Sequence, residues 1–361
     1  MAAREARAPA TGGPEQPPAV AEELTGLATR KPADGPRRSR AGGSRLLAYL
    51  GTVYVLVTLT FVLPRAMPGD PLVALLDPAA PSYVQSEALR EQLAAYYGLD
   101  RPLGEQYVSY LAGLARGDLG TSIRHNRPVA GLLAERLPWT LLLVAAAMTV
   151  AVTAGLVAGA TSGWRRGRGV DRGLLTTAMA ANSLPAFFLA SLAVFVFAAT
   201  LGWFPLSGGT TPFAALGLLE RAADIAHHLV LPAAVMAVSF AASQYLVMRA
   251  GMVSQLGADF LLMGRAKGLR ERRLKYGYAA RNALLPVVSL IAVHLGFAIT
   301  NSIYVEVVFA YPGLGRLMFE AVEFRDYPVL QACFLVLGAV VVTANYLADV
   351  LSTRLDPRMR G

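Results

Sequence analysis

The 361-residue sequence contains a single cysteine, Cys333, so a disulfide within the chain and a cysteine-based metal site are both excluded. Charge is also scarce, because only 16% of the residues are charged while 55% are hydrophobic, and the mean hydropathy is +0.45. Such a composition does not fit the surface of a soluble globular enzyme. Six stretches contain no Asp, Glu, Lys or Arg: residues 46–64, 137–164, 173–219, 225–248, 282–305 and 327–348.

Motifs for common catalytic and energy-conserving sites are missing as well. The histidines show no ligand spacing such as HExxH, and no Gly-rich GxxxxGK[ST] loop is present to bind nucleotide phosphates. None of the apolar runs carries an Asp, Glu, Lys or Arg near its middle, where proton- or sodium-coupled carriers normally need a charged group or a broken-helix ion site. The sequence therefore predicts no catalytic residue, no metal site and no self-powered transport.

The apolar runs predict membrane-spanning helices, since a hydrocarbon core of about 30 Å needs roughly 20 helical residues. Gly and Pro cluster from Gly202 onward, so the long third run is interpreted as one helix with a kink at Pro185, followed by a loop. The predicted fold class is an all-α polytopic membrane protein. Its six transmembrane helices lie at about 46–64, 138–160, 173–201, 228–248, 283–305 and 328–350.

The distribution of basic residues predicts the orientation in the membrane. With the N-terminus inside, the cytoplasmic segments hold 23 of the 33 Lys and Arg residues and the outside segments hold 10. Because short loops rich in Lys and Arg stay cytoplasmic, both termini are predicted on that side. This bias also explains the net charge of +9 without a nucleic-acid partner. Residues 1–44, which lack apolar periodicity, predict a disordered cytoplasmic tail, and residues 352–361 predict a short C-terminal one.

The outside loop at 65–136 is long enough to form a small helical subdomain between the first and second spans. Because apolar residues repeat there at helical spacing, two amphipathic helices are expected, separated by a GLDRP turn. The subdomain is either a cap on the helix ends or a docking surface for an external partner, and the sequence leaves both open. The repeating residues are Leu89, Leu93, Tyr96 and Tyr97, then Tyr107, Tyr110, Leu111 and Leu114.

The cytoplasmic segment 259–286, DFLLMGRAKGLRERRLKYGYAARNALLP, is the most informative part of the chain. Its seven basic residues alone could anchor it to anionic lipid, at about 1 kcal/mol for each basic residue near the surface. That explanation does not account for Gly268, which permits either a helix C-terminus or a close backbone approach. A short helix that ends at a glycine and precedes a basic segment is suited to filling a groove on another protein.

The segment GRAKGLRERRLKYGYAARNALLPV resembles the cytoplasmic coupling loop of one family, the membrane subunits of binding-protein-dependent ABC importers in the dipeptide/oligopeptide/nickel permease group. The family's general motif is EAA-x3-G. Here Leu262, Met263 and Gly264 occupy the Glu-Ala-Ala positions and only Gly268 is retained. The motif's Leu-Pro pair, expected at 280–281, comes five residues later at 285–286, a departure usual for the peptide group. Further similar segments follow in the family's order: FVLPRAMPGDPL at 61–72, YGLDRPLGEQYVSYLAGLARGDLGTSIRHNRPV at 97–129, LPWTLLL at 137–143, VEVVFAYPGLGRLMFEAV at 305–322, RDYPVLQA at 325–332 and LDPRMR at 355–360.

The resemblance implies a type I ABC importer permease fold in a bacterial plasma membrane. It divides the chain after the tail into a first helix at 45–64, the external subdomain, and a transmembrane core at 137–351 with its coupling loop at 250–282. The coupling helix, around residues 258–269, would occupy a cleft of a partner ATPase. The implied coupling residues are Asp259, Arg265, Ala266, Lys267, Gly268, Leu269, Glu271 and Arg272.

The resemblance also implies the partners. Two permease subunits, expected to be a heterodimer, would form the pathway, two ATPase subunits would bind ATP and Mg, and an external solute-binding protein would deliver the ligand. This chain would bind membrane lipid and no cofactor of its own, and it would not be an enzyme.

Polar residues within the predicted spans are candidates for lining the pathway, although hydrogen bonds between helices explain any one of them equally simply. These candidates are Asn182, Ser183, Gln244, Thr300, Asn301 and Ser302. The segment after the fifth span resembles the family's outer re-entry segment, which forms either a gate at the mouth or a packed turn. Its candidate gate residues are Glu306, Tyr311, Pro312 and Arg316.

The function that follows is the pore-forming subunit of an ATP-driven importer for dipeptides or oligopeptides. An importer of nickel or another small solute is the alternative within the family, because these motifs identify the type of transporter rather than the solute that it transports. A membrane-embedded enzyme or an assembly protein is a remote alternative, since the sequence contains no catalytic constellation.

Overall fold

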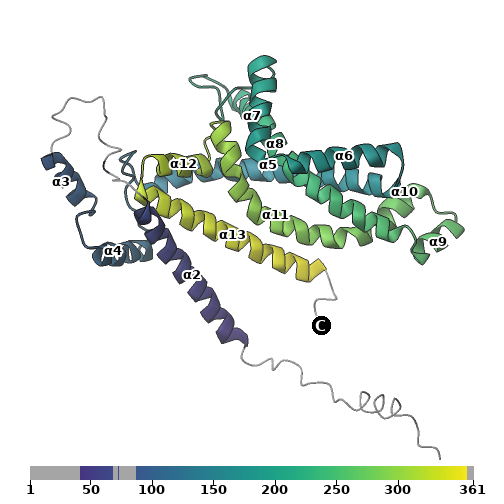
Figure 1. The fold of residues 1–361 in the computed structure, drawn as a ribbon, viewed down its shortest axis with the longest axis horizontal. Helices are drawn as coiled ribbons and strands as arrows, with labels where there is room; N and C mark the ends of the chain where they lie inside the picture. Colours follow the sequence, from purple (N-terminus) through teal and green to yellow (C-terminus); the bar gives the residue numbers. More distant parts are fainter. Residues whose placement is uncertain (1–40, 68–71, 73–86, 356–361) are drawn as a thin grey trace, which may run out of the picture. The chain divides into compact units, whose positions relative to one another are not determined.

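A computed structural model describes residues 41–67, 72 and 87–355 of the protein, and this part of the chain is helical without any strand (Figure 1). The all-α class is therefore confirmed. The chain divides into two units, residues 1–54 and 55–361, and the packing described below belongs to the second. The helices are α2 (Ala41–Ala66), α3 (Glu87–Tyr96), α4 (Leu103–Ala115), α5 (Val129–Trp164), α6 (Gly169–Ser183), α7 (Ala186–Ala193), the π-helix η3 (Val194–Thr200), α8 (Leu218–Gln255), α9 (Asp259–Ala266), α10 (Glu271–Arg273), the π-helix η4 (Leu274–Ala279), α11 (Ala280–Val308), α12 (Leu314–Glu323) and α13 (Tyr327–Leu355).

Apolar helices occupy all six regions in which spans are predicted. Within the described residues, α5 and α8 are long and apolar enough to cross a membrane by themselves, and two bent helix pairs reach that length together. Shorter apolar helices cover Gly51–Ala66 and Tyr327–Thr343. The chain is thus a multi-pass membrane protein by length and composition, whereas the count of six spans stays a prediction.

The third predicted span is not the single kinked helix expected at 173–201. Instead, α6 ends at Ser183, α7 begins at Ala186, and the two helices meet at 102°. The cause is local: Leu184 has φ −93° and ψ 131°, the extended conformation that a following proline imposes on its neighbour. Pro185 therefore interrupts the helix rather than bending it, and in Figure 1 α7 departs steeply from the direction of α6.

The described helices extend into both predicted tails. Helix α2 already includes residues 41–44, and α13 continues through Leu355 instead of ending at 351. The rest of both predicted tails, residues 1–40 and 356–361, lies outside the described part of the chain.

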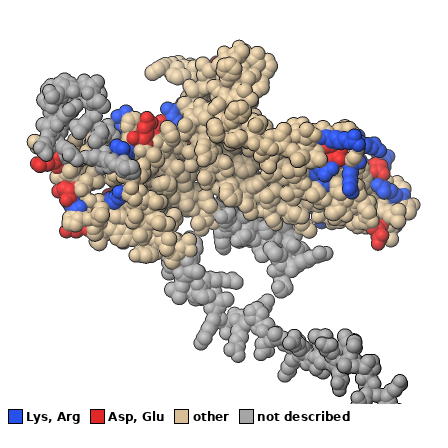
Figure 2. Space-filling model, in the orientation of Figure 1, with Lys and Arg blue, Asp and Glu red and all other residues tan. Residues whose placement is uncertain are grey.

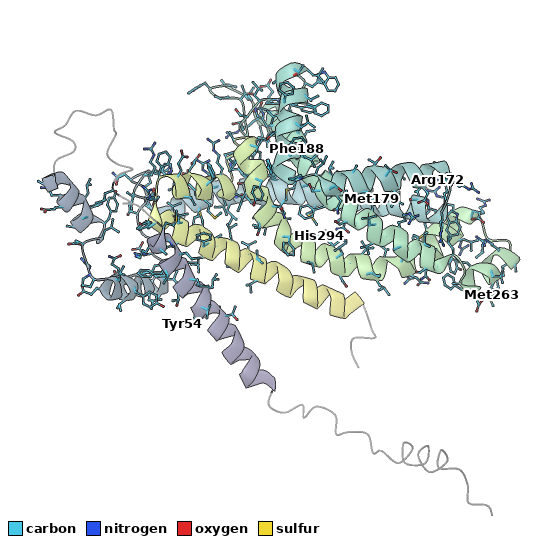
Figure 3. All side chains as sticks on the ribbon, in the orientation of Figure 1. Tyr54, Arg172, Met179, Phe188, Met263 and His294 are labelled. Atoms are coloured by element: carbon cyan, nitrogen blue, oxygen red, sulfur yellow. The ribbon has the colours of Figure 1, made fainter. Side chains whose placement is uncertain are left out.

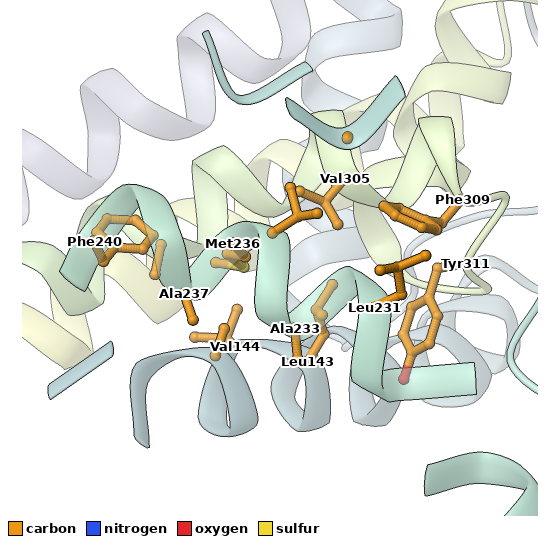
Figure 4. Packing of buried hydrophobic residues seen from close by; sticks show 14 of the residues in the cluster. Leu143, Val144, Leu231, Ala233, Met236, Ala237, Phe240, Val305, Phe309 and Tyr311 are labelled. Atoms are coloured by element: carbon orange, nitrogen blue, oxygen red, sulfur yellow. The ribbon is translucent and has the colours of Figure 1, made fainter. Parts of the chain in front are cut away.

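The core of the second unit is built around α8, which packs against α5 and α11 (Figure 4). Three glycines of α5, one helical turn apart, allow the close approach of α8. A Cβ added at Gly155 would lie 2.5 Å from the Gln244 Cβ, and one at Gly159 would lie 2.7 Å from the Met248 Cβ. A Cβ added at Gly163 would lie 2.5 Å from the Met252 Cβ. Small residues are used at membrane-helix interfaces because they bring two backbones into van der Waals contact.

Charged residues avoid the middle of this helical core. On the face drawn in Figure 2, Lys, Arg, Asp and Glu gather over α9 and α10 at one end and over the connections near α4 and α12 at the other, with uncharged surface between them. This arrangement is expected of a protein whose central band lies in hydrocarbon.

Candidate functional site

The short helix α9 ends at the glycine that the sequence singles out. Gly268 has φ +72°, its N–H donates to the Arg265 carbonyl at 2.9 Å, and the Leu269 N–H reaches back to the Gly264 carbonyl at 3.1 Å. This geometry is a left-handed helix cap, for which glycine is preferred. No atom lies within 4 Å of a Cβ added at Gly268, so within this chain the glycine turns the backbone rather than permitting a close contact.

Helix α9 has one buried and one exposed apolar face. Leu261 is fully buried, and Gly264 lies so close to Leu274 that an added Cβ would be 2.5 Å from the leucine Cδ2. Leu262 and Met263, by contrast, are 69% and 60% exposed, and Met263 points away from the neighbouring helices in Figure 3. The buried face fixes α9 to the ends of α5, α8 and α11, and the exposed face presents apolar surface.

The other predicted coupling residues surround this exposed face. Arg265 lies 3.5 Å from Glu271 in a surface ion pair, and its guanidinium lies 5.9 Å from the Trp164 ring. Leu269 is partly buried, while the remaining predicted residues of this group are exposed: Asp259, Ala266, Lys267, Gly268 and Arg272.

A partly buried ion pair that connects α6 to α8 was not found from the sequence. Asp171, at the start of α6, accepts two hydrogen bonds from the Arg249 guanidinium at 2.6 Å and 2.9 Å, and also bonds to the Ser162 hydroxyl. The Gly167 N–H donates to the same carboxylate at 2.8 Å, and the Tyr245 hydroxyl lies 2.7 Å from that of Ser162. The two charged residues are 78 positions apart, so no spacing pattern reveals them. The network holds the α5–α6 turn against α8 shortly before the coupling loop.

The predicted gate residues form a tightly packed turn. Glu306 is fully buried, and its carboxylate accepts hydrogen bonds from the N–H groups of Gly315 at 2.7 Å and Arg316 at 3.1 Å. The hydroxyls of Thr140 and Ser302 donate to it at 2.7 Å and 3.1 Å. A carboxylate is favourable there because the N-terminus of α12 presents unpaired N–H groups and a positive dipole end.

Aromatic packing completes this outer turn. The fully buried Tyr311 ring stacks edge-on against Trp139 at 5.6 Å, and Pro312 lies against Gly209, where a Cβ would be 2.9 Å from the proline ring. Arg316 pairs with Glu320 at 2.8 Å rather than with Glu306. The geometry is that of the packed turn, one of the two alternatives left open by the sequence, while a gating movement stays a prediction.

The pathway candidates separate into two groups. Asn301 lines a cavity of about 300 Å³, Gln244 lies beside it with its Nε2 3.5 Å from the His294 Nδ1, and the Asn182 Oδ1 lies 3.4 Å from the Ser243 hydroxyl. Three other candidates are not brought to this cavity. Ser302 bonds to Glu306, and the Ser183 hydroxyl donates to the Met179 carbonyl of its own helix. Thr300 is exposed and does not line the cavity.

Helices α3 and α4 occur where the spacing predicts two amphipathic helices. Phe61 of α2 contacts the rings of Tyr107 and Tyr110 at 5.0 Å and 5.6 Å, and the Tyr110 hydroxyl lies 3.1 Å from that of Thr60. Burial raises the pKa of Tyr110 above its usual value, so the phenol stays protonated and can donate this hydrogen bond. Helix α4 is therefore fixed to the end of the first predicted span.

Among the described residues, no group of three or more His, Cys, Asp and Glu side chains is arranged to hold a metal ion. The one cysteine, Cys333, is buried and unpaired.

Comparison with known proteins identifies the class. A protein-family model described as "Binding-protein-dependent transport system inner membrane component" matches residues 151–361. A protein of Brucella suis named a peptide permease is 40% identical over 318 residues, covering 88% of this chain and 97% of the relative. The oligopeptide transport system permease protein AppB of Bacillus subtilis is 35% identical over 87% of this chain and 97% of its own length. The glutathione transport system permease protein GsiC of Escherichia coli K12 is 36% identical over 88% and 97%.

The chain therefore belongs to the family of inner-membrane components of binding-protein-dependent transport systems. It is a membrane-embedded permease component and not an enzyme, and such systems pair a permease with a binding protein and an ATPase.

Proposed function

We propose that this chain is one half of the membrane pathway of an ATP-driven importer for peptides. The single observation that supports this most strongly is the similarity to peptide, oligopeptide and glutathione permeases along almost the whole length of those proteins. Their names favour peptides over nickel as the cargo. An external solute-binding protein delivers the peptide to the complex.

The exposed apolar face of α9 is the proposed docking surface for an ATPase subunit. Its two outward side chains, Leu262 and Met263, would be costly to leave in water and are flanked by basic residues, as expected of a contact that combines apolar burial with charge complementarity. The buried face of the same helix rests on Leu274 and the ends of three long helices. A movement imposed on α9 is therefore transmitted to the membrane helices. ATP and Mg are bound by the ATPase subunits, which supply the energy that this chain has no site to generate.

A second, homologous permease subunit completes the pathway, and the expected assembly is a heterodimer with two ATPase subunits. Both termini and α9 lie on the cytoplasmic side, and α4 lies outside. In this arrangement Asn182, Gln244 and Asn301 lie near the proposed pathway, and the turn around Glu306 lies at its outer mouth.

Reconstitution of the complex in liposomes tests this proposal. The complete complex should take up peptides only with ATP and a peptide-loaded binding protein, and the ATPase should co-purify with this chain. Replacement of both outward residues, Leu262→Ser with Met263→Ser, should abolish co-purification and uptake while leaving the abundance of the chain unchanged. Val108→Ser is the matched control, because Val108 is 65% exposed on the external helix α4. Peptide uptake by this chain alone, without ATP, would refute the proposal.

A further inference from the structure

The cavity beside His294 has a lining that the proposed transport role does not yet explain. The break at Pro185 turns α7 back so that it packs against both α8 and α11, and Ala186 at its start closes one side of the cavity. Figure 3 places His294 about halfway along α11. The cavity measures about 300 Å³, which is at the lower end of the size range of ligand pockets.

The cavity is lined by apolar walls and by uncharged polar groups. Its apolar lining comes from Met236, Phe240, Val293, Phe297 and Val305, and its polar lining comes from Ser239, Ser243, His294 and Asn301. Among the described residues, no Asp, Glu, Lys or Arg lines it. A metal ion or a highly charged solute would therefore lose its hydration there without gaining a charged partner.

Two buried polar atoms lack a hydrogen-bond partner within the described part of the chain, one on a residue that lines this cavity and one on a residue that contacts the lining residue His294. These are the Oγ of Ser239 and the Oε1 of Gln244. The Gln244 side chain is fully buried, and its other amide atom faces the His294 ring at 3.5 Å. Buried polar groups are normally paired, and leaving one unpaired costs about 1–3 kcal/mol. Unpaired groups at the edge of a cavity therefore indicate a partner that is not part of this chain.

The chemistry of that partner is constrained by what it must offer. It must exchange hydrogen bonds with the Ser239 hydroxyl and the His294 imidazole, and leave apolar groups against Phe240 and Phe297. A peptide group has one donor and one acceptor and carries side chains, so it meets these requirements. A lipid acyl chain has neither donor nor acceptor, and a neighbouring transmembrane helix has already paired its own backbone groups.

We propose that this cavity is a contact site for the transported peptide, in which His294 and Ser239 hold a backbone amide and Phe297 faces a cargo side chain. The inference rests on the proposed function and adds the substrate-contacting residues to it. The site holds the peptide weakly, because the cargo must leave again on the cytoplasmic side.

Uptake of two uncharged tripeptides, trialanine and trileucine, by the reconstituted complex tests the site. His294→Leu removes the ring's donor and acceptor, so uptake of both peptides should fall about tenfold, as expected for the loss of one buried hydrogen bond. His294→Gln keeps a donor and an acceptor and should restore most of the uptake. Phe297→Ala should lower the uptake of trileucine about tenfold more than that of trialanine. Only a leucine side chain is long enough to contact the Phe297 ring, so only trileucine loses a contact when the ring is removed.

The ratio between the two peptides distinguishes a substrate contact from a packing role, since a packing defect lowers both by the same factor. Thr149→Val is the control, because the Thr149 hydroxyl is exposed and bonds to its own helix at the Ala145 carbonyl. An unchanged ratio in Phe297→Ala, or wild-type uptake in His294→Leu, would overturn the inference while leaving the proposed function intact. If the wild-type complex takes up no peptide at all, the proposed function itself fails.

Cysteine labelling provides a second, independent measurement. Cys333→Ala removes the only cysteine, and Ser239→Cys then places a thiol in the cavity. Millimolar trialanine should slow its reaction with N-ethylmaleimide in the purified complex. A thiol that reacts in the isolated chain but not in the peptide-free complex would show that the sister subunit fills the cavity, and this outcome would overturn the inference.

Discussion

The hydroxyl of Thr140 connects two helices through opposite hydrogen bonds: it donates to the Glu306 carboxylate at 2.7 Å and accepts from the Leu314 N–H at 2.8 Å. One side chain of α5 thereby connects the end of α11 to the start of α12. Gly313 and Gly315 are required beside it, because a Cβ at either position would lie within 3.0 Å of a Glu306 side-chain atom. The relationship makes the outer turn a rigid unit and predicts the effect of its disruption.

Glu306→Ala should destabilise the protein strongly. The change leaves two backbone N–H groups and the Thr140 hydroxyl without their acceptor in a buried site, while the Ser302 hydroxyl keeps the Ile299 carbonyl, at an expected cost of about 3 kcal/mol in the free energy of unfolding. Glu306→Gln should cost less, because one oxygen remains for the N–H groups. The melting temperature of the detergent-solubilised complex measures both. Glu320→Gln is the control, since it breaks a partly exposed pair with Arg316. Equal melting temperatures for Glu306→Ala and Glu320→Gln would contradict the capping role.

Asp171 and Arg249 should be coupled in a double-mutant cycle. Asp171→Asn or Arg249→Gln alone leaves a buried charge without its partner and should destabilise the protein by about 3 kcal/mol, whereas the double substitution should cost less than the sum of the two. Melting temperatures of the four proteins give the coupling energy. Arg127→Gln, which breaks a pair exposed by 53% and 54%, should change little. Additive single effects would show that the ion pair does not hold α8 to the α5–α6 turn.

Gly159→Ala should separate α5 from α8 although it adds only one methyl group. The new Cβ would meet the Met248 Cβ at 2.7 Å and the Tyr245 carbonyl oxygen at 2.8 Å, so the backbones must move apart. The expected cost is about 1–3 kcal/mol. Gly131→Ala on the same helix has open space around it and should stabilise the protein by up to about 1 kcal/mol. The difference in melting temperature between the two alanine variants checks the prediction; similar values would mean that the helices are not in close contact.

Substitutions at Gly268 should lower both transport and ligand-stimulated ATP hydrolysis. Gly268→Val forces a β-branched residue into φ +72°, at a cost of about 1 kcal/mol or more, and Gly268→Asp adds a negative charge to a surface rich in Arg and Lys. If the ATPase groove is acidic, repulsion makes Asp the more damaging change. Gly268→Asn tolerates this conformation without a charge and is the control. Uptake and ligand-stimulated ATPase activity should both fall in the Gly268→Val and Gly268→Asp variants, while the abundance of the subunits stays normal. Normal uptake and normal ATPase activity in Gly268→Asp would remove the main support for docking at this helix.

Single cysteines in a Cys333→Ala background test the orientation. Val108 and Arg270 are both exposed, on α4 and just after α9 respectively. In sealed cells a membrane-impermeant maleimide should label Val108→Cys and leave Arg270→Cys unlabelled until the cells are opened. Labelling of Arg270→Cys in intact cells would disprove a cytoplasmic location for α9.

The sequence alone determined the class of this protein, because apolar composition and charge-free runs are summed over many residues and need no tertiary contact. It also located the glycine at the end of α9 and the two external helices, since glycine caps and helical periodicity are local properties. The departure from expectation at Pro185 was partly local too, but whether a proline bends or breaks a membrane helix depends on which neighbours pair the freed backbone groups.

Only the tertiary structure decided which polar residues meet. Asn182 and Ser302 look alike in sequence, yet one contacts Ser243 near the cavity and the other bonds to Glu306 in the outer turn. Asp171 pairs with Arg249, 78 positions away in the sequence. His294 becomes a candidate contact residue only because the structure places unpaired polar groups beside it. Such pairings depend on the rotation and separation of α5, α8 and α11, which are set by the fit of glycines against side chains rather than by any pattern within one helix.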